Sequence, residues 1–141
     1  MTPADLAATH AAAFTRSRPW SAAEFAGLLT QRRCHVIGDA DCFALFTLIA
    51  DETELLTIAT DPACSRQGLG RACLAAYETQ AVARGARISF LEVAADNAAA
   101  RALYDRHGFK LVSETEDDPW GAGVGEQIFE WRAEMNDGHA A

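Results

Sequence analysis

Apolar residues recur along the chain in two spacings, and these spacings predict where helices and strands lie. Intervals of three and four residues, which place side chains on one face of a helix, occur in four segments: 3–14, 21–30, 69–84 and 98–107. Short runs that are mostly apolar or alternate with polar residues are typical of strands, and six segments have them: 34–37, 42–50, 54–60, 87–94, 109–113 and 125–132.

The strand–helix–strand order in the middle of the chain decides the expected fold. Strands joined by a helix pair in parallel through a right-handed crossover, and this applies to 54–60 and 87–94. The short connection after 34–37 and the last two strands imply antiparallel pairing. We therefore expect a single α/β domain over residues 1–135, with a mixed, mostly antiparallel sheet, helices on both faces, and a disordered tail at 136–141.

The start of the second predicted helix carries a clear local signal. Ser21 followed by Glu24 matches a capping box, in which each side chain satisfies a backbone N–H of the other residue. Trp20 precedes this cap. It either packs on Phe25 as a hydrophobic staple or lines a substrate groove.

Composition limits the classes of function. The chain has 141 residues, half of them hydrophobic, and a formal net charge of −8, which argues against nucleic-acid binding through a basic surface. It has no apolar run of membrane-spanning length and no signal-peptide pattern, so we expect a cytoplasmic protein with neither a membrane nor a nucleic-acid partner. The four cysteines form no C-x-x-C pair, which favours reduced thiols and no metal site.

The segment Ser65-Arg66-Gln67-Gly68-Leu69-Gly70-Arg71 connects the strand 54–60 to the helix 69–84. A Gly-x-Gly turn at a helix start leaves backbone N–H groups free, and the absence of Cβ atoms lets another group approach them closely. The pattern indicates an anion site for phosphate or pyrophosphate. The alternative is a glycine-rich turn that binds no ligand. A P-loop lysine and the third glycine of a Rossmann fingerprint are both missing, which disfavours those two nucleotide sites.

Glu92 is the charged residue on an otherwise apolar face of the strand 87–94. Alternation places it in line with Ile88, Phe90 and Ala94. A carboxylate among apolar neighbours needs a reason. It is either a general base whose pKa is raised by burial or the partner of a nearby Arg or Tyr.

Four pieces of the chain together carry a family resemblance. They are Pro19-Trp20-Ser21 with Phe25; Glu54–Pro62 leading into Arg66–Arg71; Leu91-Glu92-Val93 with Asn97; and Leu103-Tyr104 with Gly108-Phe109. In this order and spacing they resemble the GCN5-related N-acetyltransferase (GNAT) family, and most closely its ribosomal-protein alanine N-acetyltransferase branch. The resemblance implies a GNAT-like domain in which the central parallel strands, 54–60 and 87–94, splay apart.

The resemblance also implies acetyl-CoA as the donor substrate, without a metal. Its pyrophosphate would lie on the Gly-x-Gly helix start, and a backbone N–H near Ile58 or Ala59 would polarise the acetyl carbonyl. The positions that correspond to donor contacts in the family are Ile58, Ala59, Thr60, Arg66, Gln67, Gly68, Leu69, Gly70, Arg71 and Asn97.

Acetyl transfer to an amine requires a neutral amine, a stabilised carbonyl oxygen and a proton for the leaving thiolate. By resemblance, Glu92 is the base and Tyr104 is the acid that protonates the sulfur. Glu54 lies on the strand where many relatives place their base and is the alternative. A tyrosine on a helix face is otherwise typical of a core residue.

The resemblance points to the α-amine of a protein N-terminus as the acceptor, with a small first residue followed by basic residues. Trp20 and Glu54 are the expected acceptor contacts, and the acidic segment Glu114–Trp120 would attract a cationic peptide. The branch carries tyrosine-rich, basic sequence at this segment, so a small-molecule amine is an alternative acceptor. A non-catalytic acyl-CoA-binding module is a second alternative, but such a module would normally lose Glu92 and Tyr104.

Overall fold

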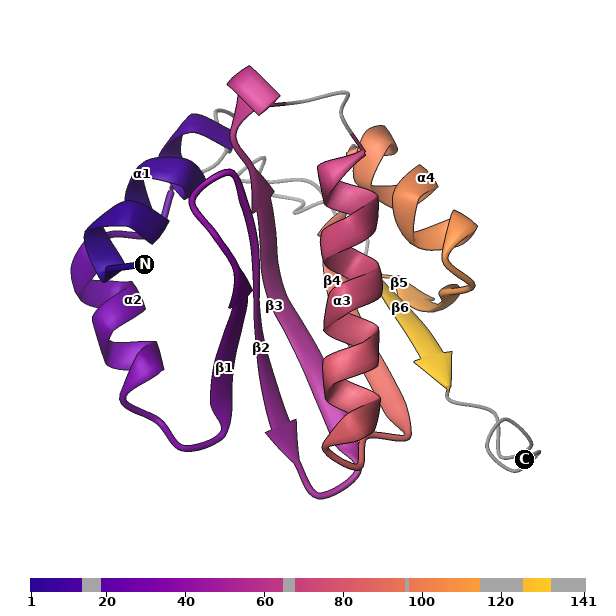
Figure 1. The fold of residues 1–141 in the computed structure, drawn as a ribbon. Helices are drawn as coiled ribbons and strands as arrows, with labels where there is room; N and C mark the ends of the chain where they lie inside the picture. The colour runs from indigo at the N-terminus through magenta and orange to yellow at the C-terminus, as the bar shows by residue number, and fades with distance from the viewer. Residues whose placement is uncertain (14–18, 65–67, 96, 115–125, 133–141) are drawn as a thin grey trace, which may run out of the picture.

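The computed structural model describes residues 1–13, 19–64, 68–95, 97–114 and 126–132, and its elements follow the predicted order (Figure 1). The elements are α1 (Pro3–Ala13), α2 (Ala22–Leu29), β1 (Cys34–Gly38), β2 (Cys42–Ile49), β3 (Glu52–Thr60), the short 3₁₀ helix η1 (Pro62–Cys64), α3 (Leu69–Ala83), β4 (Ile88–Ala94), α4 (Ala98–Arg106), β5 (Lys110–Glu114) and β6 (Glu126–Arg132). The predictions about Arg66, Gln67, the tail at 136–141 and most of the acidic segment lie outside the described residues.

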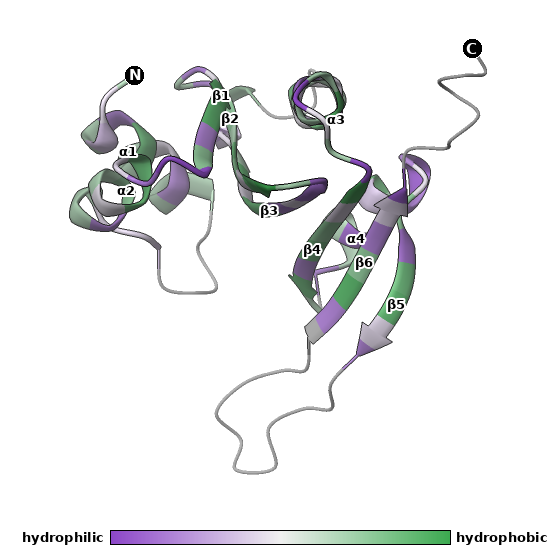
Figure 2. Ribbon diagram, turned by 90° about the horizontal axis from the view of Figure 1, so that it is seen from below, coloured by the Kyte–Doolittle hydropathy of each residue, from purple (hydrophilic) through white to green (hydrophobic). Residues whose placement is uncertain are grey.

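One six-stranded sheet runs through the fold in the order β1-β2-β3-β4-β6-β5. β3 and β4 are parallel, and all other neighbouring strands are antiparallel. The helices α1 and α2 cover one face beside β1–β3, whereas α3 and α4 pack on the opposite face (Figures 1 and 2). This confirms the predicted single α/β domain with a mixed sheet and helices on both faces.

The central parallel strands pair along only part of their length. Their register runs from Glu52 opposite Ile88 to Leu55 opposite Leu91 and then stops. Leu56 is an extra residue in β3 relative to β2, which makes a β-bulge, and bulges bend the strand that contains them. β3 therefore leaves β4 at the bulge, and Figure 2 shows β1–β3 and β4–β6–β5 as two wings, which confirms the expected splay.

The paired half of these strands is held by a buried tyrosine from α3. The Tyr77 hydroxyl donates to the Thr53 hydroxyl oxygen at 3.2 Å and forms a 2.5 Å hydrogen bond with the Ser89 hydroxyl. Thr53 is in β3 and Ser89 is in β4, so one side chain ties three elements together. Burial is the main reason that the pKa of Tyr77 rises to about 12.

Each face of the sheet has its own apolar core. The α3-side core contains Leu55, Leu91 and Val93, while the α1/α2-side core contains Phe25 and Ala59 among its members. Strand β2 contributes to both cores because its residues from 42 to 46 are buried on alternate faces. In β3, by contrast, buried residues alternate with more exposed ones.

Local signals of the sequence are confirmed in the caps. Glu24 N–H donates to the Ser21 hydroxyl at 3.1 Å and Ser21 N–H donates to the Glu24 carboxylate at 3.0 Å, so the capping box forms. The Asn97 side chain accepts the N–H of Ala100 at 3.1 Å and caps α4. All four cysteines are free thiols, and three of them are buried. Across the described segments, no helix has the length and apolar character needed to cross a membrane.

Candidate active site

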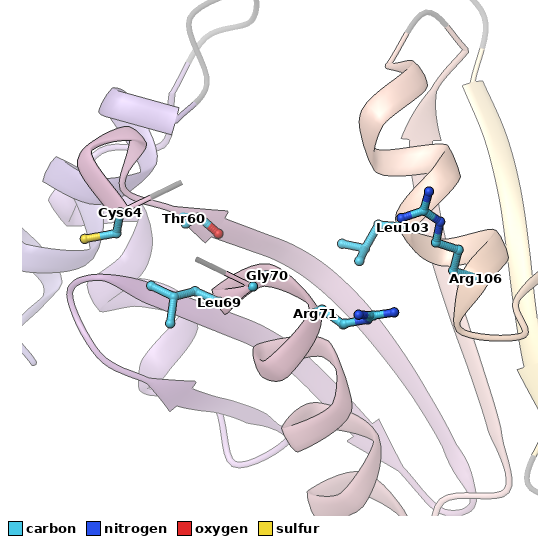
Figure 3. A pocket seen from close by; sticks show the side chains of 8 residues that line it. Thr60, Cys64, Leu69, Gly70, Arg71, Leu103 and Arg106 are labelled. Atoms are coloured by element: carbon cyan, nitrogen blue, oxygen red, sulfur yellow. The ribbon is translucent and has the colours of Figure 1, made fainter. Parts of the chain in front are cut away.

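A cavity of about 350 Å³ opens between the start of α3 and the side of α4 (Figure 3). We call it the α3 cavity, and the residues that line it are Thr60, Cys64, Gly68, Leu69, Gly70, Arg71, Leu103 and Arg106. The first backbone N–H groups of a helix have no acceptor within the helix. Because the first turn of α3 lines the cavity, these groups and the positive end of the helix dipole make it suited to an anion.

Gly68 and Gly70 suit this turn for two different reasons. Gly68, the N-cap of α3, has φ +76°, a left-handed conformation that residues with a Cβ rarely adopt. Gly70 has an ordinary helical position, but a Cβ there would lie 3.6 Å from Thr60 Oγ1 and 3.9 Å from Leu103 Cδ2. A methyl group would fit between these neighbours, whereas a longer side chain would occupy the cavity.

Two arginines add positive charge to the cavity from different helices. Arg71 extends from α3 and Arg106 from α4, and both line the same space (Figure 3). Guanidinium groups bind phosphate oxygens with two parallel hydrogen bonds. The pKa of the neighbouring His107 is lowered by burial first and by the charge of Arg71 second. Arg71 was predicted from the sequence, whereas Arg106 was not.

The other predicted donor contacts divide into three groups. Thr60, Gly68, Leu69 and Gly70 line the α3 cavity with Arg71. The side chains of Ile58 and Ala59 pack in the two cores instead, which leaves only their backbone groups for a ligand. Asn97 caps α4, and Arg66 and Gln67 lie outside the described residues.

Glu92 lies one residue beyond the last β3–β4 pair, on the face opposite α3. Its strand neighbours Leu91 and Val93 point into the α3-side core, so alternation turns Glu92 the other way. Its side chain is exposed, and the expectation that apolar neighbours bury it is wrong. The reason is tertiary: α1 and α2 lie beside β1–β3, and within the described segments no helix covers this part of β4 (Figure 2).

Glu54 shares that face with Glu92. It is exposed and lies opposite Phe90 in the parallel register, two residues before the position of Glu92. The two candidate bases are therefore on neighbouring strands and the same side of the sheet. The two strands separate only beyond Leu55. Of the two carboxylates, Glu92 is therefore the one that lies where β3 and β4 diverge.

Tyr104 lies in the α3-side core. It is 7% exposed, and its ring centroid is 5.8 Å from that of Phe109 and 6.4 Å from that of Phe129. Burial raises the pKa of its phenol above the ordinary value. The phenol is consequently protonated at neutral pH, as a proton donor must be.

Trp20 belongs to an aromatic cluster that the sequence only partly predicted. Its ring centroid is 5.5 Å from that of Phe25, which supports the staple, and 5.0 Å from that of His10, on which it stacks. The Trp20 N–H donates to His10 Nδ1 at 3.1 Å. Burial lowers the pKa of His10, which favours the neutral imidazole that this acceptor role requires. No sequence spacing pointed to His10, because its partner lies ten residues away across a connection.

Trp20 also lines a groove of about 580 Å³ on the α1/α2 side of the sheet. We call it the α2 groove, and its residues are Trp20, Glu24, Gly27, Leu28, Gln31 and Leu56. Trp20 is thus both a staple and a groove residue. The α3 cavity and the α2 groove lie on opposite faces of the sheet, and β3 and β4 are unpaired beyond Leu55 and Leu91.

Comparison with known proteins agrees with this arrangement. Residues 10–109 match the acetyltransferase (GNAT) family. The chain is 39% identical over 107 residues to the [Ribosomal protein bS18]-alanine N-acetyltransferase of Escherichia coli K12, which covers 73% of this chain and 72% of that protein. The crystal structure of the ribosomal-protein-S18-alanine N-acetyltransferase from Escherichia coli superposes with a TM-score of 0.80 at 30% identity, covering 95% of this chain and 91% of the other.

A more distant structure shares the same fold. This is yncA, an acetyltransferase from Salmonella typhimurium with its cofactor acetyl-CoA, at a TM-score of 0.73 and 19% identity, covering 96% of this chain and 92% of that one. The extent of the family match shows that the chain belongs to the GNAT family. It is an acetyl-CoA-dependent N-acetyltransferase.

Proposed function

We propose that this enzyme acetylates the α-amine of a protein N-terminus in the cytoplasm, with residues 1–135 as its catalytic domain. The observation that carries the proposal is the 39% identity to an enzyme named [Ribosomal protein bS18]-alanine N-acetyltransferase. The family match covers residues 10–109, which include Trp20 on the acceptor side as well as Gly70 and Tyr104 on the donor side.

Acetyl-CoA binds on the α3 side in this proposal. Its pyrophosphate lies against the first turn of α3, where Gly68, Leu69 and Gly70 supply backbone N–H groups. Arg71 and Arg106, which line the same cavity, bind phosphate oxygens with their guanidinium groups. The amide-containing arm of the donor then follows the edge of β3 from Leu56 to Thr60, which β4 leaves unpaired.

The remaining donor contacts complete the proposed site. Arg66 and Gln67 directly precede Gly68 in the sequence, and Asn97 lies at the start of α4, which follows β4 in the chain. A backbone N–H of Ile58 or Ala59 polarises the acetyl carbonyl, because it lies on the strand edge that the arm follows. No metal takes part in this scheme.

The acceptor amine reaches the acetyl group from the opposite face. Glu92 accepts a proton from the incoming ammonium, directly or through a water molecule, and the neutral nitrogen attacks the thioester carbonyl carbon. The new C–N bond forms, and the intermediate carries negative charge on the carbonyl oxygen and positive charge on the nitrogen. The nitrogen then releases its second proton to water as the C–S bond breaks. Tyr104 gives its phenolic proton to the leaving sulfur and regains one from solvent. Two observations support these roles: Glu92 is exposed beside the splay, where an amine can approach it, and the phenol of Tyr104 is protonated.

Trp20 and Glu54 contact the acceptor in this scheme, since both lie on the side of the sheet that Glu92 faces. We also propose a small first residue followed by basic ones. Glu114, at the end of β5, belongs to the acidic segment that would attract such a peptide.

The test is the position of the acetyl group on a synthetic acceptor. We would incubate the enzyme with acetyl-CoA and a peptide that begins with alanine and carries one internal lysine, and locate the label by fragment mass spectrometry. Polyamines and aminoglycosides would be tested in parallel at low and high salt. The proposal predicts acetylation of the α-amine at a rate that falls with salt. A preference for the lysine or for a small amine would contradict it.

A further inference from the structure

Two cysteine thiols meet behind the α3 cavity. Cys42, the first residue of β2, and Cys73, in the second turn of α3, are 6% and 8% exposed and belong to the same apolar core. A hydrogen bond joins their side chains. The fold therefore holds two thiols in contact, one on a strand and one on a helix, that the proposed acetyl transfer does not use.

This thiol pair is one hydrogen bond away from the cavity. Cys42 Sγ lies 3.2 Å from Thr60 Oγ1, and Thr60 lines the cavity at the end of β3 (Figure 3). The same hydroxyl oxygen would lie 3.6 Å from a Cβ at Gly70, which places it beside the first turn of α3. Cys73 follows Gly70 by about one helical turn. A movement of the two sulfur atoms therefore acts on both β3 and α3 where they line the cavity.

The two thiols differ in the protonation that their surroundings favour. Hydrogen bonding to Cys73 is the main reason that the pKa of Cys42 is lowered, against the effect of burial. The same hydrogen bond, together with burial, raises the pKa of Cys73. Cys42 is thus the side chain that becomes a thiolate, the nucleophile of thiol chemistry, and Cys73 keeps its proton beside it. A reactive thiolate next to a second thiol is the arrangement typical of a reversible disulfide.

We propose that Cys42 and Cys73 are a modification site at which hydrogen peroxide forms a reversible disulfide, and that this disulfide weakens the binding of acetyl-CoA. The formation of the disulfide does not depend on the proposed function. Its effect on the donor does rest on it, because it needs acetyl-CoA in the α3 cavity. Disulfides in cytosolic proteins are usually transient and regulatory, which is the behaviour proposed here.

The oxidation proceeds in two steps. The Cys42 thiolate attacks one oxygen of the peroxide, the O–O bond breaks, and Cys42 becomes a sulfenic acid while hydroxide leaves and takes up a proton to form water. The sulfur of Cys73 then attacks the sulfur of Cys42, the S–S bond forms, and the S–O bond breaks as the second water leaves with the Cys73 proton. The two thiols lose two electrons and the peroxide gains them. A dithiol reverses the modification by thiol–disulfide exchange.

The disulfide would change the shape of the cavity. A covalent S–S bond is much shorter than a hydrogen bond between two thiols, so its formation draws α3 towards β2. Cys42 also loses its thiol proton, which weakens the contact with the Thr60 hydroxyl. The backbone N–H groups at the start of α3 then leave the positions that suit a pyrophosphate. We expect the affinity for acetyl-CoA to fall about tenfold, the effect of losing one charged hydrogen bond.

The cavity also gives the oxidant its route. Hydrogen peroxide that enters the cavity reaches the Thr60 hydroxyl, which contacts Cys42 Sγ. Bound acetyl-CoA occupies the same space, so it should slow the oxidation. Cys64 also lines the cavity and is the competing thiol. Burial first and the charge of Asp41 second raise the pKa of Cys64, which makes it the less reactive of the two.

The first measurement maps the disulfide in the unsubstituted protein. Reduced protein is treated with a small excess of hydrogen peroxide, free thiols are alkylated, and the chain is digested without reduction by trypsin and a protease that cuts after acidic residues. Cuts after Asp41 and Asp51 leave Cys42 as the one cysteine of its peptide, and the cut after Arg71 does the same for Cys73. Fragment mass spectrometry should find these two peptides linked, dithiothreitol should release them, and acetyl-CoA added before the peroxide should slow their linkage.

The second measurement is the affinity of the same samples for acetyl-CoA by isothermal titration calorimetry. The oxidised protein should bind about tenfold more weakly than the reduced protein, and dithiothreitol should restore the affinity. Cys42→Ser removes the attacking sulfur but keeps a hydroxyl beside Thr60, and peroxide should leave its affinity unchanged. Cys34→Ser is the matched control, because it replaces a buried thiol of β1 outside the pair and should keep the full response to peroxide.

The outcomes separate this inference from the proposed function. Oxidised protein without linked Cys42 and Cys73 peptides would overturn the inference, and so would a linked pair that binds acetyl-CoA as the reduced protein does. A loss of affinity in oxidised Cys42→Ser would assign the effect to another thiol and would also overturn it. No acceptor is present in either measurement, so a wrong acceptor assignment changes neither result. If Gly70→Glu binds acetyl-CoA normally, the proposed donor site is wrong and the predicted effect on affinity falls with it.

Discussion

The cavities on the two sides of the sheet are lined by different parts of the chain. In the α3 cavity, two glycines leave the backbone of the first turn of α3 accessible, and Arg71 and Arg106 add positive charge. The α2 groove depends on side chains, with Trp20, Leu28 and Leu56 as its walls. A backbone site tolerates little change in sequence, whereas a groove made of side chains can change from one enzyme to the next. The donor side therefore carries a readable motif and the acceptor side does not.

The largest predicted effect is on the binding of acetyl-CoA to the α3 cavity. Gly70→Glu should abolish acetyl-CoA binding while the fold remains intact, because the side chain would fill the α3 cavity and place a negative charge where the pyrophosphate belongs. The loss of a set of charged hydrogen bonds amounts to several kcal/mol. Isothermal titration calorimetry with acetyl-CoA measures it, and circular dichroism checks the fold.

Gly70→Ala is the matched control for that variant. Its Cβ would make only ordinary contacts with Thr60 and Leu103. Its affinity for acetyl-CoA should fall far less than that of Gly70→Glu. Equal losses in the two variants would contradict the placement of the pyrophosphate.

The next largest effect is expected from the proposed catalytic pair, whose two residues lie on opposite sides of the sheet. Glu92→Gln and Tyr104→Phe should each lower kcat/KM by roughly 10²–10⁴, the usual contribution of a positioned acid or base. The affinity for acetyl-CoA should change little, since neither residue lines the α3 cavity. Steady-state kinetics over a range of pH measure this, and Glu92→Gln should lose the rise of kcat/KM on the acid limb.

Glu54→Gln is the companion variant for the base. Glu54 lies on the same face as Glu92, but on the strand across the parallel register. If Glu92→Gln turns over normally and Glu54→Gln does not, the base is on β3 and the assignment to Glu92 is wrong.

The differences between the two sides of the sheet explain which features could be predicted from the sequence. The parallel pair, the capping box of Ser21 and the glycine turn at Gly68 and Gly70 follow from local rules of turns, caps and crossovers. Arg106 joins the α3 cavity because α4 packs beside α3, and no spacing along the chain reveals that approach.

The acceptor side was less predictable for a physical reason. Alternation correctly placed Glu92 on one face of its strand, but it cannot tell whether a helix covers that face, and none in the described chain does. The bulge at Leu56 changes which residues of β3 face α3, and neither its apolar run nor its composition signals it. The contact of His10 with Trp20 joins two elements across a connection.

A smaller effect is expected when His10, which contacts Trp20 on the proposed acceptor side, is replaced. His10→Phe keeps a ring against Trp20 but removes the Nδ1 atom that accepts its N–H. We expect a loss of about 1 kcal/mol of stability and a several-fold higher KM for the acceptor peptide, with the KM for acetyl-CoA nearly unchanged. Kinetics with each substrate varied in turn measure this, and equal changes in both KM values would show a general loss of structure.

The same histidine predicts a pH dependence. Its folded pKa is below the usual 6.5 because burial disfavours the charged ring, and the opposing effect of Glu24 is smaller. The unfolded chain therefore binds the proton more readily, and the stabilising contribution of neutral His10 is lost as the pH falls from about 6.5 through the lowered pKa. Denaturant titrations should show this acid loss in the unsubstituted protein but not in His10→Phe.

The smallest predicted effect is on the stability of the protein and comes from Glu78 in α3. One carboxylate oxygen of Glu78 in α3 is buried and has no hydrogen-bond partner within the part of the chain that the structure describes, and burial raises its pKa from 4.5 to about 7. The folded protein thus holds a proton that the unfolded chain releases, so stability is complete below about pH 4.5 and falls as the pH rises through 7.

Glu78→Gln removes that buried charge. Solvent still screens the group in part, so the expected gain is about 1 kcal/mol at pH 8, and it should vanish near pH 4.5. Denaturation midpoints at the two pH values measure it. A gain that is the same at both would show that the charge of Glu78 is not the cause.

Calorimetric titration of acetyl-CoA into Gly70→Glu and Gly27→Phe tests the central claim most directly, because the two substitutions lie on opposite faces of the sheet. If donor and acceptor bind on separate sides, Gly27→Phe binds acetyl-CoA as the unsubstituted enzyme does and Gly70→Glu shows no binding. Loss of acetyl-CoA binding in folded Gly27→Phe, or its retention in Gly70→Glu, would contradict the account.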